Sequence, residues 1–139
     1  MYLLDTNVIS ETRKPRPHQG VLAWIASVPT SDMYLCAVTM GELQKGIERT
    51  RRQDPQKAEE ISRWVDLLAS AYEITPVDGR IFREWATLMY GRSEDRWEDV
   101  LIAATARIHR WIVVTRNVID FEDLDVKVLN PFSASAQGN

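Results

Sequence analysis

Apolar and polar positions along the chain follow two different periods, which predict short strands separated by helices. Apolar runs rich in β-branched or aromatic residues predict strands at 2–5, 33–38, 72–77, 111–115 and 126–130. Apolar residues that recur at helical spacing predict helices at 21–28, 39–52, 55–71, 79–89 and 99–109. Strands that alternate with helices indicate an α/β fold with a mostly parallel sheet.

Length and composition narrow the class of protein. The 139 residues favour one domain, which we expect to span 1–132, followed by a small, polar and disordered tail at 133–139. The single cysteine excludes an internal disulfide and fits a reducing compartment. No apolar run approaches the ~20 residues of a membrane span, and the first residues lack a basic signal-peptide region. A soluble, cytoplasmic protein without a membrane partner is the expectation.

The charge pattern leaves room only for local contacts with an anionic partner. A formal net charge of −3 argues against a surface coated in positive charge for nonspecific nucleic-acid binding. Two basic segments stand out, at 13–18 and 45–57. Each is ordinary solvated surface when taken alone, and phosphate binding becomes arguable only if an acidic site lies nearby.

Polar and acidic side chains follow the predicted strands where ligands of parallel sheets bind, beyond the carboxyl ends. Asp5 ends the first strand, and the helix after the second strand carries Glu42 in its first turn. The helix before the fourth strand runs antiparallel to the strands, so its N-terminus, with Asp99, points to the same edge. The loop after the fourth strand adds further candidates: Thr115, Arg116, Asn117 and Asp120. We therefore expect Asp5, Glu42 and Asp99 at one rim, with Asp120 able to join them.

Each acid also has a purely structural interpretation. Thr39 and Glu42 fit a capping box, and Asp99 is favourable at a helix N-terminus. Asp120 fits a turn, and Asp5 fits the N-cap of a short helix that begins near Thr6.

Gathered together, however, these carboxylates repel one another, and a hard divalent ion such as Mg²⁺ or Mn²⁺ relieves the repulsion. The two histidines, His18 and His109, lie apart from the acids in sequence, which disfavours zinc.

Five ordered segments carry a resemblance to a known family. They are "LLDTNVISE", "TMGELQKGI", "DVLIAATA", "VVTRNVIDF" and "VLNP". In this order and spacing they resemble the PIN-domain family, in particular the VapC and FitB-like toxins of type II toxin–antitoxin modules. The resemblance implies a Rossmann-like, three-layer α/β/α fold with a mostly parallel five-stranded sheet.

The resemblance also implies roles for individual residues. It assigns metal binding and catalysis to Asp5, Glu42 and Asp99, and it leaves open whether Asn117 or Asp120 provides the fourth position. Thr6 and Asn7 match polar positions that orient the first aspartate. Thr115 matches a polar position at the floor of the site, and Arg116 is a candidate for positioning the RNA backbone.

The implied function is that of a Mg²⁺- or Mn²⁺-dependent endoribonuclease. Such a toxin hydrolyses RNA phosphodiester bonds, arrests growth and is neutralised by a cognate DNA-binding antitoxin of the VapB or FitA type. The resemblance further implies a homodimer and a higher assembly with the antitoxin on operator DNA.

Three other classes compete with this interpretation. A phosphoacceptor receiver domain needs an acceptor aspartate after the third strand and a lysine after a late strand, and the chain offers only Asp78, which fits a helix cap. A haloacid-dehalogenase phosphatase needs a second aspartate where Asn7 stands. A non-catalytic PIN-like module that binds RNA or an antitoxin is the third alternative, and the full set of acids argues against it.

Overall fold

The computed structural model describes residues 1–133. Its centre is a five-stranded sheet in the order β3-β2-β1-β4-β5, with every neighbouring pair parallel. The strands are β1 (Tyr2–Leu4), β2 (Met33–Cys36), β3 (Glu73–Thr75), β4 (Ile112–Val114) and β5 (Val128–Leu129). Because all strands run the same way, their carboxyl ends form a single edge, as the sequence predicted.

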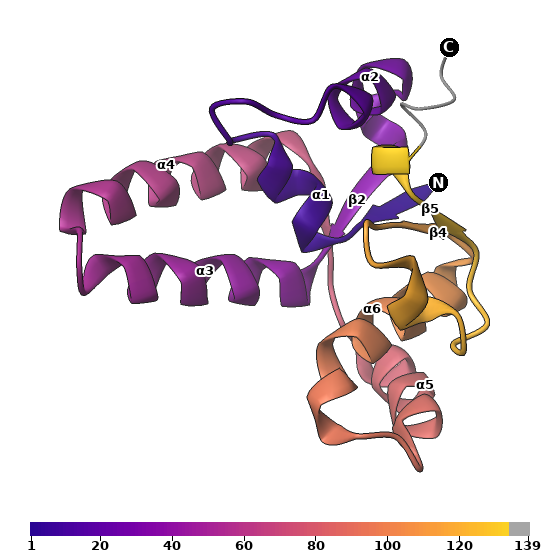
Figure 1. Cartoon of the computed structure of the whole chain (residues 1–139). Helices are drawn as coiled ribbons and strands as arrows, with labels where there is room; N and C mark the ends of the chain where they lie inside the picture. Colours follow the sequence, from indigo (N-terminus) through magenta and orange to yellow (C-terminus); the bar gives the residue numbers. More distant parts are fainter. Residues whose placement is uncertain (134–139) are drawn as a thin grey trace.

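Helices connect the strands and lie on both faces of the sheet (Figure 1). The α-helices are α1 (Thr6–Glu11), α2 (Gln19–Ser27), α3 (Ala37–Arg51), α4 (Pro55–Ala71), α5 (Gly79–Met89) and α6 (Trp97–His109). Three short 3₁₀ turns complete the connections: η1 (Thr30–Asp32), η2 (Glu94–Arg96) and η3 (Val118–Phe121). Among the helices of residues 1–133, none is long and apolar enough to cross a bilayer.

Alternating side chains of the strands build a core on each face of the sheet. Leu4 and Leu35 belong to a cluster with buried residues of α1, α2, α3 and α4. Their strand neighbours Leu3 and Cys36 belong to the opposite cluster, with residues of α5, α6 and η3. Neighbouring residues of a strand point to opposite faces, so a buried run of this kind needs helices on both sides. The result is the expected three-layer α/β/α arrangement.

The order of the strands places a crevice beside β1. The chain proceeds from β1 outward to β2 and β3, and then returns to the other side of β1 to form β4. Ligands of open α/β sheets bind at such a switch point, outside the carboxyl ends of the strands. Of the tail expected at 133–139, Ser133 lies within the described residues, where its hydroxyl donates to the carbonyl of Asn130, and 134–139 lie outside them.

Candidate metal-binding active site

Asp5 is a buried carboxylate at the junction of β1 and α1. It is 5% exposed, and its backbone N–H donates to the carbonyl of Val114 at 2.9 Å, which fastens the end of β1 to β4. Its carboxylate accepts hydrogen bonds from the Thr6 backbone at 2.8 Å, the Thr115 hydroxyl at 2.9 Å and the Asn7 amide at 3.2 Å. Asp5 is also the N-cap of α1, so the structural interpretation of this residue is confirmed. Its second carboxylate oxygen accepts the hydrogen bonds from Thr115 and Asn7, which the capping of α1 does not require.

Residues after β4 form a bracket around Asp5. The side-chain oxygen of Asn7 accepts from the Arg116 backbone at 3.1 Å, and its amide also reaches the Thr115 hydroxyl at 3.2 Å. The same hydroxyl accepts from the Asn117 backbone at 3.0 Å. The bracket joins two segments that lie more than a hundred residues apart in sequence, and it leaves Asp5 little rotational freedom.

Glu42 lies on α3, close enough to Asp5 for their charges to interact. The helix begins at Ala37 with Cys36 as N-cap, so the predicted capping box of Thr39 and Glu42 is wrong, because Glu42 falls beyond the first turn. Its carboxylate instead accepts from the Thr6 hydroxyl at 2.8 Å. Because Glu42 does not cap α3, its carboxylate can take part in a site at the carboxyl edge of the sheet.

Glu42 has a raised pKa, which shows the electrostatic character of the site. Burial is the largest cause, and the charges of Glu98, Asp5 and Asp99 add to it, bringing the pKa to about 7 despite the hydrogen bond from Thr6. A carboxylate with this pKa is only partly ionised near neutral pH. A nearby cation would therefore strongly stabilise the ionised form of Glu42.

Asp99 lies in the first turn of α6, as the sequence predicted. Burial, followed by the charges of Asp5 and Asp120, raises its pKa to about 6, and the Arg96 guanidinium opposes the rise. Burial likewise raises the pKa of Asp5, with a smaller contribution from Asp120. The four predicted acids therefore lie close enough together for their charges to repel one another.

Asp120 and Asn117, the two candidates for the fourth position, play different parts. Asp120 adds negative charge to both Asp5 and Asp99, from the exposed turn η3. Asn117 contributes its backbone N–H to the Thr115 hydroxyl. Of the two, Asp120 supplies the carboxylate.

Glu98 is a member of the cluster that the sequence did not single out. Its charge raises the pKa of both Glu42 and Asp99. The sequence offered only its place beside Asp99 at a helix N-terminus, which the helix dipole alone explains. Its coupling to Glu42 depends on the packing of α3 beside α6, which no local pattern reveals.

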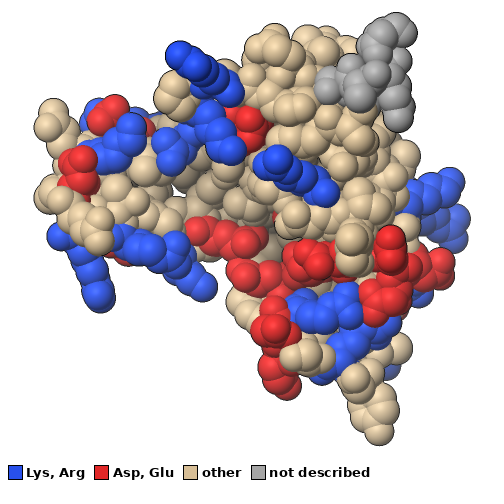
Figure 2. Space-filling view, viewed as in Figure 1, with Lys and Arg blue, Asp and Glu red and all other residues tan. Residues whose placement is uncertain are grey.

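Figure 2 shows acidic side chains gathered between the α3–α4 pair and the α5–α6 pair. Among residues 1–133, no three His, Cys, Asp or Glu side chains stand at the spacing of a preformed metal cage. Mg²⁺ does not require one, since it usually keeps several waters and takes one or two carboxylates together with substrate phosphates. The oxygen-only donors and their mutually raised pKa values fit a hard divalent ion.

A basic groove of about 600 Å³ opens beside the acids, between α1, α3 and α4. Thr6 and Glu42 line its acidic end. Its cationic lining consists of Arg13, Lys14, Arg49 and Lys57. Figure 2 shows lysine and arginine side chains over the α3–α4 pair.

Some of the predicted basic residues are engaged within the protein. Lys14 pairs with buried Glu11 at 2.8 Å, and Arg51 pairs with Glu48 and Glu59. Arg116 is exposed beside the bracket, and its guanidinium lies 4.6 Å from the ring centre of Phe132. The groove and Arg116 are two cationic surfaces close to the acids, and Arg96 is a third cation beside Asp99.

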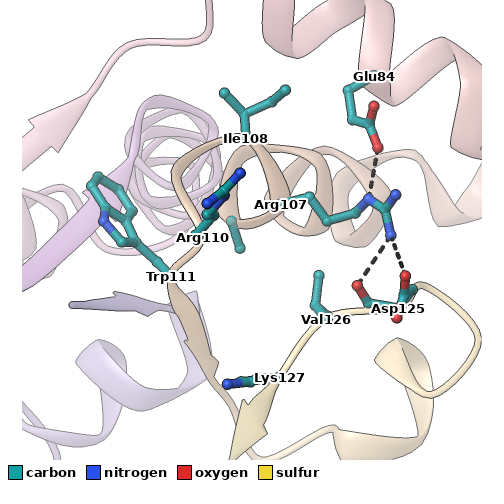
Figure 3. Close-up of a pocket in the computed structure, with 9 residues that line it drawn as sticks. Glu84, Arg107, Ile108, Arg110, Trp111, Asp125, Val126 and Lys127 are labelled. Carbon is teal, nitrogen blue, oxygen red and sulfur yellow. Dashed lines mark hydrogen bonds and ion pairs between the residues drawn. The ribbon is translucent and has the colours of Figure 1, made fainter.

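A second pocket, of about 500 Å³, lies where α6 turns into β4, at the amino ends of the strands (Figure 3). The Arg107 guanidinium crosses it and pairs with Glu84 at 2.6 Å and with Asp125 at 3.1 Å. Since this cation is neutralised by the protein itself, and the acidic cluster lies at the carboxyl ends, we assign no catalytic role to this pocket.

Comparison with known proteins agrees with this architecture. Toxin FitB from Neisseria gonorrhoeae (strain ATCC 700825 / FA 1090) is 35% identical over 138 residues, covering 95% of this chain and 99% of FitB. The VapC ribonuclease Y4jK from Sinorhizobium fredii (strain NBRC 101917 / NGR234) is also 35% identical, covering 95% and 98%. A solved structure of FitAB bound to an IR36 DNA fragment superposes with a TM-score of 0.79 at 33% identity, covering 95% of this chain and 96% of that one. The PIN domain as a family matches residues 2–127. By its sequence and by its fold, the chain belongs to the PIN-domain family.

Proposed function

We propose that this protein is a divalent-metal-dependent endoribonuclease and the toxin of a type II toxin–antitoxin module. One observation carries the proposal: four acids, from the end of β1 and from α3, α6 and η3, influence one another electrostatically at the carboxyl edge of the sheet. The family membership and the relatives named FitB toxin and VapC ribonuclease support the same activity. We assign Asp5, Glu42, Asp99 and Asp120 as the metal-binding and catalytic residues.

A bound Mg²⁺ or Mn²⁺ ion would polarise a phosphate oxygen and favour the ionised form of water near it. The protein's own contribution is to hold the acids in place. Asp5 is fixed by Thr6, Asn7 and Thr115, so it provides a rigid reference for the others. Glu42 is held toward the other acids by the Thr6 hydroxyl, and a bound divalent ion would keep its carboxylate ionised.

The basic groove and Arg116 would position the RNA. Arginine and lysine contacts to phosphates fix the register of a nucleic acid without reading its sequence. The groove meets the acids at Glu42, so a strand that follows it passes over the cluster. This placement suits single-stranded or looped RNA, whose backbone can enter an open groove.

Partners follow from the similarity to FitAB. That complex was solved on a DNA fragment, with a toxin 33% identical to this chain. We propose that a DNA-binding antitoxin of the VapB or FitA type neutralises this protein and that the complex assembles on operator DNA. We also propose that the protein acts in the cytoplasm as a homodimer.

RNA cleavage by purified Asp5→Asn protein tests the proposal. The variant keeps the shape and the Thr6 hydrogen bond of Asp5 but removes the charge, so we expect a loss of cleavage of at least about 10²-fold with the fold intact. Asp66→Asn, an exposed aspartate on α4, is the matched control and should cleave normally. Cleavage by folded Asp5→Asn at the control's rate would refute the active site. Normal Mn²⁺ binding by the unchanged protein, without any cleavage, would favour the non-catalytic binding module instead.

A further inference from the structure

An arginine clamp joins the N-terminus of α6 to the turn that carries Asp120. The guanidinium of Arg96 donates to both carboxylate oxygens of Asp123, at 2.8 Å each, and to the backbone carbonyl of Asp120 at 2.9 Å. Two parallel bonds of this kind fix the planes of both groups. The hydrogen bonds from Arg96 hold the pKa of Asp123 well below its usual range, so the pair is charged at neutral pH.

Packing and the clamp both hold the turn that carries Asp120: its neighbour Phe121 is buried against α6, whereas Asp120 itself points to solvent-exposed surface. It is exposed, and within residues 1–133 its carboxylate accepts no hydrogen bond from another side chain. Its backbone N–H donates to the Asn117 carbonyl at 3.1 Å, inside the same turn. Phe121 ties the turn to α6 by packing, and the Arg96 bond to the Asp120 carbonyl adds the hydrogen bond that fixes Asp120 itself relative to the start of α6, the helix that carries Asp99.

Arg92 offers an internal comparison. Its Nε donates to the Asp123 carboxylate at 3.1 Å, and its Nη2 donates to the Asp123 backbone carbonyl at 2.8 Å. It also donates to the carbonyl of Leu88, and among the described residues it makes no hydrogen bond to Asp120, so it ties Asp123 to the end of α5.

We propose that Arg96 is a positioning residue that holds Asp120 near Asp5 and Asp99 and thereby sets the affinity of the site for a divalent ion. The inference rests on the proposed function, since it takes these acids as the metal-binding set. Arg96 would act through the carbonyl of Asp120 and the carboxylate of Asp123.

The sign of the effect separates this role from a simple charge effect. As a point charge, Arg96 repels a divalent cation at the neighbouring acids, so its removal should tighten metal binding. As a positioning residue it brings Asp120 to the ion, so its removal should weaken binding. The two roles therefore predict opposite changes in the same measurement.

Calorimetric titration of the metal-free protein with Mn²⁺ tests the proposal without using activity. We expect Arg96→Gln to weaken binding about tenfold, the lower end for outer residues of metal sites. Asp120→Asn should weaken it at least as much, and the double variant should be no weaker than Asp120→Asn alone. Arg92→Gln should have a smaller effect, and Arg83→Gln, an exposed arginine on α5, should have none.

Unchanged or tighter binding by Arg96→Gln, or additive losses in the double variant, would overturn the proposal. Should Arg96→Gln fail to fold, Arg96→Lys keeps the charge without the planar pair of donors and should show the same direction of change. Asp5→Asn distinguishes failure of the proposed metal site from failure of the Arg96 clamp. If Asp5→Asn binds Mn²⁺ normally, the proposed metal site is wrong, whereas a loss in Asp5→Asn with no effect of Arg96→Gln removes only the clamp.

Discussion

At the scale of single residues, the acids of the site lower the stability of the folded protein when they are ionised. The pKa values of Glu42 and Asp99 rise to about 7 and about 6, so the folded state binds these protons more tightly than the unfolded chain does. Their contribution to stability is full below the ordinary values near 4 and is lost as the pH rises through 6 and 7. The metal-free protein should therefore unfold more easily at pH 8 than at pH 5, as thermal unfolding in a chelator will show. Mg²⁺ should recover more stability at pH 8 than at pH 5, because it binds the ionised acids.

Glu42→Gln provides the control for this pH dependence. The amide cannot ionise, so the variant should lose less stability between pH 5 and pH 8 than the unchanged protein, and it should respond less to Mg²⁺. Glu60→Gln, an exposed glutamate on α4, should leave the pH dependence as it was. An unaltered pH dependence in Glu42→Gln would show that burial and the neighbouring acids do not raise the pKa of Glu42.

At the scale of elements, local capping fixes helix ends independently of the site. Asp78 is the N-cap of α5, and its carboxylate accepts from the Ile81 backbone at 3.0 Å. Replacing it with alanine should lower the free energy of unfolding by about 1 kcal/mol in urea titrations. Mn²⁺ affinity should stay unchanged, because Asp78 caps α5 and none of the helices that carry the acids. A change in affinity as large as that of an acid variant would mean that α5 takes part in the site.

The same capping logic explains which elements the sequence predicted well. α4 begins at Pro55 after the cap Asp54, as predicted, because proline and aspartate form an unambiguous start signal. α3 was misplaced by two residues because Thr39 imitates an N-cap, while the real start at Ala37 follows Cys36 and has no side-chain cap. Asp5, Glu42 and Asp99 could be predicted at one edge of the sheet, because parallel topology places the end of β1 and the starts of α3 and α6 there. Glu98 and the Arg96–Asp123 clamp were missed because they depend on packing between distant segments.

At the scale of the whole molecule, the distribution of charge matters more than its sum. The formal net charge is −3, yet the basic groove lies directly beside the acidic cluster. Arg49 and Lys57 line this groove and make no ion pair within the described residues. These two side chains are therefore available for the phosphates of a bound strand.

Salt dependence measures whether they bind phosphates. In the Asp5→Asn background, which should not cleave, log affinity for single-stranded RNA should fall with log salt concentration, with a slope of about −0.7 for each phosphate neutralised. Arg49→Gln and Lys57→Gln should each weaken binding and reduce that slope by about 0.7. Arg63→Gln, an exposed arginine elsewhere on α4, should leave both unchanged. Equal slopes for all three variants would place the RNA outside the groove, because a phosphate contact cannot be removed without releasing fewer counterions on binding.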